Sequence, residues 1–414
     1  MITVGLDFGT HQTKICIEKK DGAELGYKFF RFKDLNDKEQ YTLPSIIHID
    51  EKGQLTYGYI PKNKKGEIVR YFKQAAFTSS ETGLSQMEAI HFSIWYIAFI
   101  LFDLEEEYGQ DFSIQMGVPS DGARLKQQKI LAVRILLSAY KLVEEVFRNN
   151  KHLFLYSTIQ ELESITELVM FSQEKKEEFT LLVFPEAYAC LMPLVKLSKI
   201  TEGMSLMIDI GGGTTDISFF TIKNGKPQVY DFYSINKGLN YLTDAINMSK
   251  ERTTSNVEDG DIQNNRITVL QDRINSIHDR LIGKLKWELK IQTNIHVKRL
   301  INALKGRPII YSGGGSTFKI LRKTYGDFKD VMYVSEKEWN TKSIKDIGEI
   351  QDLGLCPILS TAYGLSISVT DDEINCEPFR DLFSNLRPDE DKEQNVYTSK
   401  YNSFSYTDDY DAIK

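Results

Sequence analysis

Short apolar runs that end at glycine-containing turns alternate along this chain with longer segments of helical periodicity. Near the start, the apolar run MITVGLDF ends in a turn that contains Gly9, and KICIEKK follows it. Apolar runs bounded by turn residues are typical of strands, so residues 2–19 are predicted to form a β-hairpin. The same pattern predicts further strands at TLPSIIHID, QLTYGYI, SIQMGVP and TLLVF.

Helical periodicity separates these strands. Apolar residues recur at helical spacing in residues 85–108, 121–150 and 158–178, which predicts a helix in each segment. PEAYACLMPLV is predicted to be a further helix, opened by Pro185.

The second half of the chain repeats this order of elements. SLMIDIGGGTTDISFFTIKNG reads as a second hairpin, VYDFYSIN as a strand and GLNYLTDAI as the start of a helix. A polar loop is predicted at 249–265, a helix at 266–305, a strand, glycine turn and helix in RPIIYSGGGSTFKILRKTYG, and a last helix in PILSTAYGLSISV. This weak duplication predicts two similar α/β lobes around a cleft.

Composition narrows the class of protein. The 414 residues are 41% hydrophobic and 26% charged, which allows a sizeable core. A net charge of −7 argues against nucleic-acid binding, and the four scattered cysteines form no zinc or disulfide pattern. The start lacks a signal-peptide pattern, and the run FSIWYIAFILF is too short to span a bilayer. A cytoplasmic protein without a membrane partner is expected.

The negative charge is concentrated at the end of the chain. Residues 371–414 contain twelve acidic and five basic side chains, so the rest of the chain is neutral overall. We therefore expect an acidic C-terminal tail at 379–414, which is more typically solvated than specifically docked.

The two hairpin turns carry the candidate chemistry. Each follows an apolar strand that ends with an aspartate, Asp7 in DFGT and Asp209 in DIGGGT. Glycine lets backbone N–H groups approach an anion, and a carboxylate beside such a turn suits the water shell of Mg²⁺. Two such turns facing across a cleft would hold the phosphates of a nucleotide. Neither turn matches a P-loop or a GxGxxG motif.

A third glycine cluster, SGGGSTF at 312–318, also follows an apolar strand. Because a helix is predicted after it, its N–H groups would suit a phosphate or the polar edge of a nucleoside. A plain strand-to-helix turn is the alternative.

These segments together resemble the actin-like ATPase superfamily and, within it, the nucleotide-binding domain of the 70-kDa heat-shock chaperones. The matching segments are GLDFGTHQTKICI, TLPSIIHI with RYFKQ, VFPEAYACL, IDIGGGTTDIS, and SGGGSTFKI with LSTAYGLSISV. The resemblance implies an α/β, actin-like (ribonuclease H-like) fold that binds ATP or ADP with Mg²⁺.

The resemblance also implies roles for single residues. Asp7, Asp209 and Asp216 would lie beside Mg²⁺, and Lys73, Glu186, Asp209 and Thr214 would serve catalysis. Lys73 would approach the γ-phosphate and the attacking water, and Glu186 would position water or metal at the hinge. The implied nucleotide-binding residues are Gly9, Thr10, His11, Gly211, Gly212, Gly213, Thr214, Gly238, Gly314, Gly315, Ser316 and Phe318.

The resemblance further implies the domain limits. Lobe I would comprise residues 1–196 and 357–378, and lobe II residues 203–356 with a reduced outer subdomain at about 240–305. Residues 120–180 are longer than in the chaperones, and we expect no peptide-binding domain after the lobes. At the position of Phe318 the chaperones usually carry a basic residue that stacks on adenine. An aromatic ring can also stack there, but this departure weakens the expectation of a purine.

The leading hypothesis is a chaperone-like protein that binds ATP, hydrolyses it in a Mg²⁺-dependent reaction and closes its lobes on the nucleotide. One alternative is a filament-forming bacterial actin-like protein. Another is a nucleotide-sensing regulatory module of low turnover, which would signal through a protein partner. The sequence leaves the oligomeric state and the choice between ATP and GTP open.

Overall fold

The computed structural model describes two lobes, each built on a mixed β-sheet. All described residues belong to one unit, Met1–Cys376. The predicted acidic tail at 379–414 lies outside the described residues. These are residues 2–369 without 23, 62–64, 79–82, 120–123, 172–180, 197–204, 224, 243–258, 293–306, 327, 329, 334–338 and 340–341.

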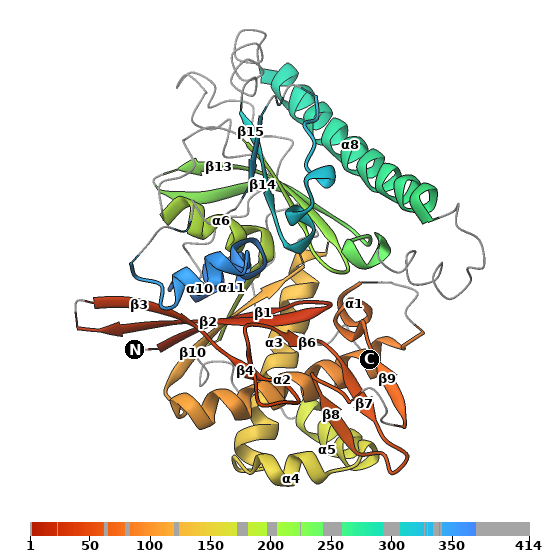
Figure 1. Cartoon of the computed structure of the whole chain (residues 1–414), viewed down its shortest axis with the longest axis vertical. Coiled ribbons are helices and arrows are strands. Elements are labelled where there is room, and N and C mark those ends of the chain that lie inside the picture. Colours follow the sequence, from red (N-terminus) through yellow and green to blue (C-terminus); the bar gives the residue numbers. More distant parts are fainter. Residues whose placement is uncertain are drawn as a thin grey trace, which may run out of the picture. The chain divides into compact units, whose positions relative to one another are not determined.

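The sheet of lobe I has the strand order β11-β10-β1-β2-β3, with β6 paired to β2 (Figure 1). The central strand β1 is buried along nearly its whole length, as expected for a strand covered on both faces. It pairs in parallel with β10 and antiparallel with β2, which confirms the predicted first hairpin. The strands are β1 (Ile2–Phe8), β2 (Gln12–Asp21), β3 (Glu24–Phe29), β6 (Leu43–Pro44), β10 (Phe112–Val118) and β11 (Leu181–Pro185).

The sheet of lobe II repeats this plan. Its order, written in the same direction, is β16-β15-β12-β13-β14. Its central strand β12 is antiparallel to β13 and parallel to β15, as β1 is to β2 and β10. The strands are β12 (Ser205–Ile210), β13 (Thr215–Lys223), β14 (Lys226–Ile235), β15 (Pro308–Ser312) and β16 (Asp330–Tyr333). Two sheets of equal order and direction confirm the predicted actin-like, ribonuclease H-like fold.

Helices and two small sheets surround the sheet of lobe I. The predicted helix at 121–150 corresponds to α3 and one π-helical turn, η1, which follows it, so the helical stretch ends at Val146 rather than at residue 150. The helices are α1 (Phe72–Phe77), α2 (Gln86–Tyr108), α3 (Leu125–Lys141), η1 (Leu142–Val146), α4 (Lys151–Tyr156) and α5 (Ile159–Phe171). The small sheets contain β4 (Phe32–Lys33), β5 (Glu39–Gln40), β7 (Ile47–Ile49), β8 (Leu55–Tyr57) and β9 (Glu67–Val69).

Helix α2 forms the centre of the lobe I core. Its start is held by a capping box, in which Ser85 and Glu88 bond each other's backbone N–H groups. Among the described residues, it is the one helix long and apolar enough to cross a membrane, and most of it is buried within the protein. The core contacts account for its apolar composition.

Two helices lie between the sheets and touch both lobes (Figure 1). They are α6 (Glu186–Lys196) and α11 (Cys356–Ser366), the two predicted hinge helices. A Cβ atom on Gly364 of α11 would lie 1.7 Å from the carbonyl oxygen of Ala189 in α6. A Cβ atom on Gly5 of β1 would lie 2.2 Å from the backbone nitrogen of Ser366. Glycine therefore allows α11 to press directly on both α6 and β1.

Lobe II departs from the predictions in two places. Helix α8 (Asp259–Gln292) begins within the stretch predicted as a loop at 249–265. The glycine cluster after β15 runs into the first of two short 3₁₀ turns, η3 (Gly314–Thr317) and η4 (Lys319–Leu321), where a longer helix was predicted. The hydroxyls of Ser316 and Thr317 donate to the carbonyls three residues earlier, at 2.6 and 2.7 Å, which favours the tighter turn.

A segment from the second half of the chain pairs with the edge of the first sheet. The N–H of Tyr27 in β3 donates to the carbonyl of Ser343 at 2.8 Å, and the N–H of Lys345 donates to that of Tyr27 at 2.8 Å. Just beyond, Arg31 contacts Asp346 and Glu349 at 3.0 and 2.7 Å, close to the start of α10 (Ile347–Asp352). The edge strand is therefore covered by chain that comes from far along the sequence.

Replacing Gly364 with alanine tests the helix crossing. We expect Gly364→Ala to lower the free energy of unfolding by about 1–3 kcal/mol, because the backbones of α6 and α11 must separate to admit the methyl group. The matched control is Gly348→Ala in α10, where nothing lies within 4 Å of the added Cβ. That change should leave stability within about 1 kcal/mol of the parent. Denaturant unfolding of both variants measures this, and equal effects would contradict the crossing.

Candidate functional site

The two glycine-containing hairpin turns of the central strands face each other. A Cβ atom on Gly212 would lie 2.6 Å from Cβ of His11, and one on Gly213 would lie 2.7 Å from Cγ2 of Thr10. Nδ2 of Asn240 also lies 3.5 Å from Nδ1 of His11. The structure therefore brings together the turn residues that the sequence analysis singled out in each half of the chain.

Backbone donors remain open in both turns. Within the described part of the chain, the N–H groups of Thr10, Gly212 and Gly213 donate no hydrogen bond. The carbonyls of Gly211 and Gly212 accept hydrogen bonds from the N–H groups of Leu239 and Asn240, at 2.9 and 2.7 Å. Successive unpaired N–H groups in a turn are an arrangement that can bind anions.

Gly238 supports the second turn from behind. A Cβ atom there would lie 2.5 Å from the carbonyl oxygen of Gly211 and 2.8 Å from the backbone nitrogen of Thr214. Any side chain would push the turn forward, which explains the glycine. Its implied contact with a ribose stays a prediction.

Carboxylates surround the turns. Asp209 and Asp216 are direct cross-strand partners in the second hairpin. Oδ2 of Asp209 accepts from the Cys190 thiol at 3.3 Å, and Oδ2 of Asp216 accepts from the Thr214 hydroxyl at 3.2 Å. The other carboxylate oxygen of each, Oδ1, is buried and has no partner among the described residues.

Burial raises the pKa of both aspartates. The pKa of Asp209 rises to about 6, mainly through desolvation and also through the charges of Glu186 and Asp7. The pKa of Asp216 rises to about 8, again mainly through desolvation and then through Glu186 and Asp209. The site therefore contains more negative charge than its own lysines balance.

Two largely buried lysines, Lys14 and Lys73, neutralise part of that charge. Nζ of Lys14 lies 2.7 Å from Oδ2 of Asp7. Burial opposes the charge on Lys14, but Asp7, Glu186 and Asp209 raise its pKa above the usual value. Nζ of Lys73 lies 2.5 Å from Oε1 of Glu186 and 5.7 Å from the centre of the Phe8 ring. Predicted residues Lys73 and Glu186 thus form one ion pair.

The position of Glu186 depends on another glycine. Glu186 is the first residue of α6, directly after β11. A Cβ atom on Gly117, near the end of the neighbouring strand β10, would lie 2.7 Å from Cγ of Glu186. The absence of a side chain at Gly117 therefore leaves the space that the glutamate occupies.

Sequence reasoning missed Lys14 and Cys190. Lys14 is the cross-strand partner of Asp7, so the register of the predicted hairpin could have revealed it. Cys190 is buried, and its thiol also lies 2.8 Å from Oγ1 of Thr361 in α11. That contact joins the two hinge helices beside Asp209, and nothing in the local sequence signals it.

The donor set fits a hydrated Mg²⁺ ion better than a directly caged metal. Among the described residues, no group of three or more His, Cys, Asp or Glu side chains is placed to hold a metal by itself. The unpartnered Oδ1 atoms of Asp209 and Asp216 are acceptors suited to metal-bound water. The site also contains more carboxylates than lysines, and a bound cation would offset this excess of negative charge.

The third glycine cluster lies beside this site. A Cβ atom on Gly313, which has a φ of 79°, would lie 2.2 Å from Oδ1 of Asp209, and one on Gly315 would lie 2.2 Å from Cγ2 of Ile210. The hydroxyl of Ser316 is bonded within its own turn, and the side chain of Phe318 is half exposed. Contacts of Gly314, Gly315, Ser316 and Phe318 with a nucleoside stay predictions.

Comparison with known proteins gives similarity to solved structures. No protein-family model matches the chain, and no curated protein matches it either. A non-polymerising mutant of MamK bound to AMPPNP is 15% identical, with a TM-score of 0.41 over 88% of this chain and 97% of that one. MreB5 of Spiroplasma citri bound to ADP is 13% identical, with a TM-score of 0.42 over 88% and 95%. At such low scores the likeness carries no weight for function.

Replacing Asp216 with asparagine tests the charge imbalance. Because the pKa of Asp216 is higher in the folded state than in the unfolded state, protonation of this carboxyl favours folding. This contribution is fully present below about pH 4, near the unfolded-state pKa, and is lost as pH rises to the folded-state pKa of about 8. We expect Asp216→Asn to become progressively more stable than the parent between pH 5 and 8, by at most about 1.4 kcal/mol per pH unit.

The measurement is denaturant unfolding at several pH values with EDTA and without nucleotide. Asp272→Asn on α8 replaces an exposed carboxylate and is the control, because its effect should not grow with pH. A stability difference for Asp216→Asn that stays constant from pH 5 to 8 would contradict the assignment.

Proposed function

We propose that the chain binds a Mg²⁺-nucleotide, ATP or ADP, between its two hairpin turns and hydrolyses ATP. The observation that carries the proposal is the close approach of the two turns, whose backbone N–H groups are unpaired among the described residues and which are flanked by largely buried lysines and carboxylates. Phosphoryl transfer depends mainly on positioning and on neutralising charge, and this set of groups suits both tasks.

Each group has a distinct role in the proposal. The N–H groups of Thr10, Gly212 and Gly213 and the ammonium of Lys14 bind phosphate oxygens. The carboxylates of Asp7, Asp209 and Asp216 accept hydrogen bonds from the water shell of Mg²⁺, whose charge neutralises developing charge on the phosphates when it is bound.

The Lys73–Glu186 pair faces the reaction from the other side. In the proposal Glu186 orients the attacking water and accepts its proton, while Lys73 stabilises negative charge on the γ-phosphate. Their 2.5 Å contact holds the carboxylate in one direction. Because Glu186 begins α6, movement of the hinge helices would change its position relative to the phosphates.

The chaperone-like reading receives no support from the comparisons. MamK and MreB5 match the filament-forming alternative better than the chaperone-like hypothesis. At TM-scores of 0.41 and 0.42 they carry no argument for either. Light scattering and sedimentation with ATP separate the readings directly. A nucleotide-dependent rise in scattering would favour filaments. ATP turnover without assembly would favour the chaperone-like reading, and tight ADP binding without turnover would favour the regulatory module.

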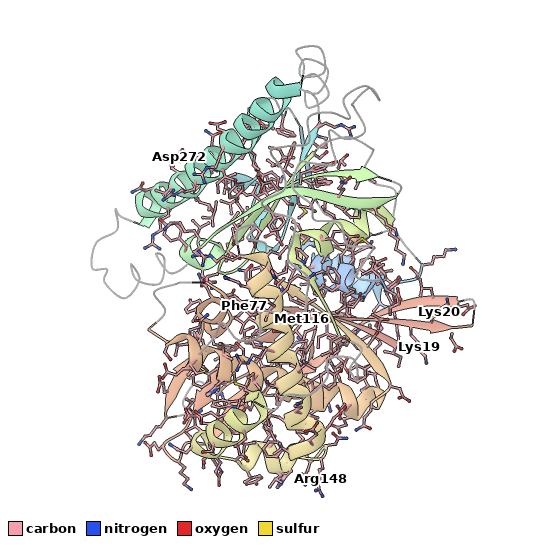
Figure 2. The ribbon with its side chains drawn as sticks, turned by 180° about the vertical axis from the view of Figure 1, so that it is seen from behind. Lys19, Lys20, Phe77, Met116, Arg148 and Asp272 are labelled. Atoms are coloured by element: carbon pink, nitrogen blue, oxygen red, sulfur yellow. The ribbon has the colours of Figure 1, made fainter. Side chains whose placement is uncertain are left out.

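Removal of the Lys14 ammonium tests phosphate binding. We expect Lys14→Ala to weaken ATP binding at least tenfold, because a charge-assisted hydrogen bond is lost. The control is Lys19→Ala, an exposed lysine toward the outer end of the same strand, β2 (Figure 2). Calorimetric titration with ATP, ADP and GTP, with and without Mg²⁺, measures the affinities. Failure of the parent protein to bind any of them would refute the proposal.

Neutralising Glu186 tests the hydrolysis step. Glu186→Gln should lower the turnover number about 100-fold or more and change the Kd for ADP little, because the carboxylate acts on water rather than on the nucleotide. Glu167→Gln, at an exposed position of α5, is the control. Release of phosphate gives the rate. Unchanged turnover in Glu186→Gln would remove this residue from the mechanism.

A further inference from the structure

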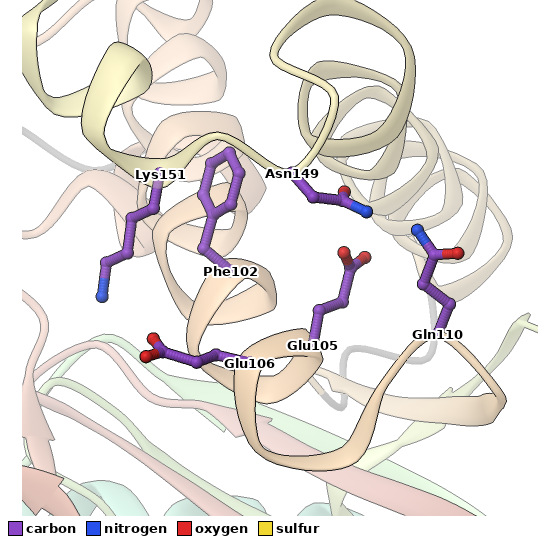
Figure 3. A pocket seen from close by; sticks show the side chains of 6 residues that line it. All are labelled: Phe102, Glu105, Glu106, Gln110, Asn149 and Lys151. Carbon is purple, nitrogen blue, oxygen red and sulfur yellow. The ribbon is translucent and has the colours of Figure 1, made fainter.

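A second cavity lies in lobe I, outside the candidate nucleotide site. It has a volume of about 370 Å³ and lies between the end of α2 and the turn that joins η1 to α4 (Figure 3). None of the residues that line it belongs to the site described above. They are Phe102, Glu105, Glu106, Gln110, Asn149 and Lys151.

The carboxylate of Glu105 is the unusual feature of this cavity. Both of its oxygens are buried, and neither has a hydrogen-bond partner of normal geometry in the described part of the chain. Burial, and then the charge of Glu144, raises the pKa of Glu105 to about 7, while the Gln110 amide acts in the opposite direction. Burying a carboxylate with so few donors is costly, so a ligand that supplies donors would relieve this cost.

The lysine in the cavity does not fill that role. The ammonium of Lys151 is bound to Asp103 and lies 4.6 Å from the centre of the Phe99 ring. Figure 3 shows its end directed away from the carboxylate of Glu105. The exposed Glu106 adds a second negative charge on the same helical turn. The cavity therefore has carboxylates on one side that no lysine balances, and the Phe102 ring lies between Lys151 and Asn149 (Figure 3).

The backbone beside the cavity holds Asn149 in place. Arg148 and Asn149 both have positive φ values, 47° and 61°, directly after the π-helical turn η1. The N–H of Asn149 donates to the carbonyl of Val143 at 2.9 Å, which fixes this turn. Figure 3 shows the amides of Asn149 and Gln110 directed toward the space beside the Glu105 carboxylate, and both residues are exposed.

We propose that this cavity binds a guanidinium group, which pairs with the Glu105 carboxylate and packs against Phe102. A guanidinium presents two parallel N–H donors that match both oxygens of a carboxylate, and its flat face packs on aromatic rings. The amide oxygens of Asn149 and Gln110 can accept its remaining donors. The group would come from a small molecule or from an arginine side chain, since the recognising chemistry is the same.

Calorimetric titration at pH 8 tests the site with two probes. Agmatine represents a free small molecule, and N-acetyl-arginine amide represents an arginine within a polypeptide. We expect the parent protein to bind at least one of them, and Glu105→Gln to bind it at least tenfold more weakly. The matched control is Glu107→Gln, two residues along α2, where the carboxylate lies 2.7 Å from Nζ of Lys28. That variant should bind as the parent does.

A second variant and a change of pH keep the test independent of folding. Phe102→Leu keeps an apolar side chain but removes the flat ring, and it should also weaken binding. Lowering the pH from 8 to 6 should weaken binding to the parent, because protonated Glu105 no longer offers a charged acceptor, and it should leave residual binding to Glu105→Gln unchanged. Absence of binding by both probes, or equal affinity in the parent and Glu105→Gln, would overturn the proposal.

Binding of agmatine alone would assign the cavity to a small molecule, whereas binding of the arginine amide alone would assign it to a protein side chain. Both results support a guanidinium site. The outcome does not depend on the nucleotide site, because none of the mutated residues lies there and the titrations contain no nucleotide.

Discussion

The crossing of α6 and α11 is the contact on which the arrangement of the candidate site depends. Gly364 lets the two helix backbones meet, and Gly5 lets α11 lie on the central strand of lobe I. From α6, Glu186 reaches Lys73, and Cys190 reaches both Asp209 and Thr361. One closely packed pair of helices therefore sets the relative positions of groups that originate in both lobes.

The same site carries a free-energy cost that a ligand would relieve. Buried carboxylates with unpaired oxygens and raised pKa values lower the stability of the fold, since the two lysines offset their desolvation only in part. A bound cation and anionic phosphates would satisfy these carboxylates and the open N–H groups together. Such a ligand would stabilise the fold by mass action, so affinity and stability would be coupled through the same atoms.

The sequence predicted the fold well and the site only in part. The hairpins around Asp7 and Asp209 are local, and glycine and apolar periodicity were enough to predict them and the duplicated lobes. The helix expected after Gly315 was wrong, because side-chain hydroxyls close tighter turns there. The Cys190 contacts could not be predicted, since they depend on how distant helices cross. Lys14 could have been found, because hairpin register alone places it opposite Asp7.

The pairing of residues 343–345 with the edge of β3 has a consequence for how the chain can be divided. The first sheet is completed by a segment that follows nearly all of lobe II. A fragment that ended after α6 would expose the β3 edge with unpaired backbone groups, a form of strand that invites association with other chains. Arg31 would also lose its contacts with Asp346, which directly precedes α10, and with Glu349 in α10. The halves resemble each other in architecture, yet the first takes the cover of its sheet edge from chain that follows lobe II, so we expect an isolated lobe I to need this closing segment supplied in trans or spliced onto it.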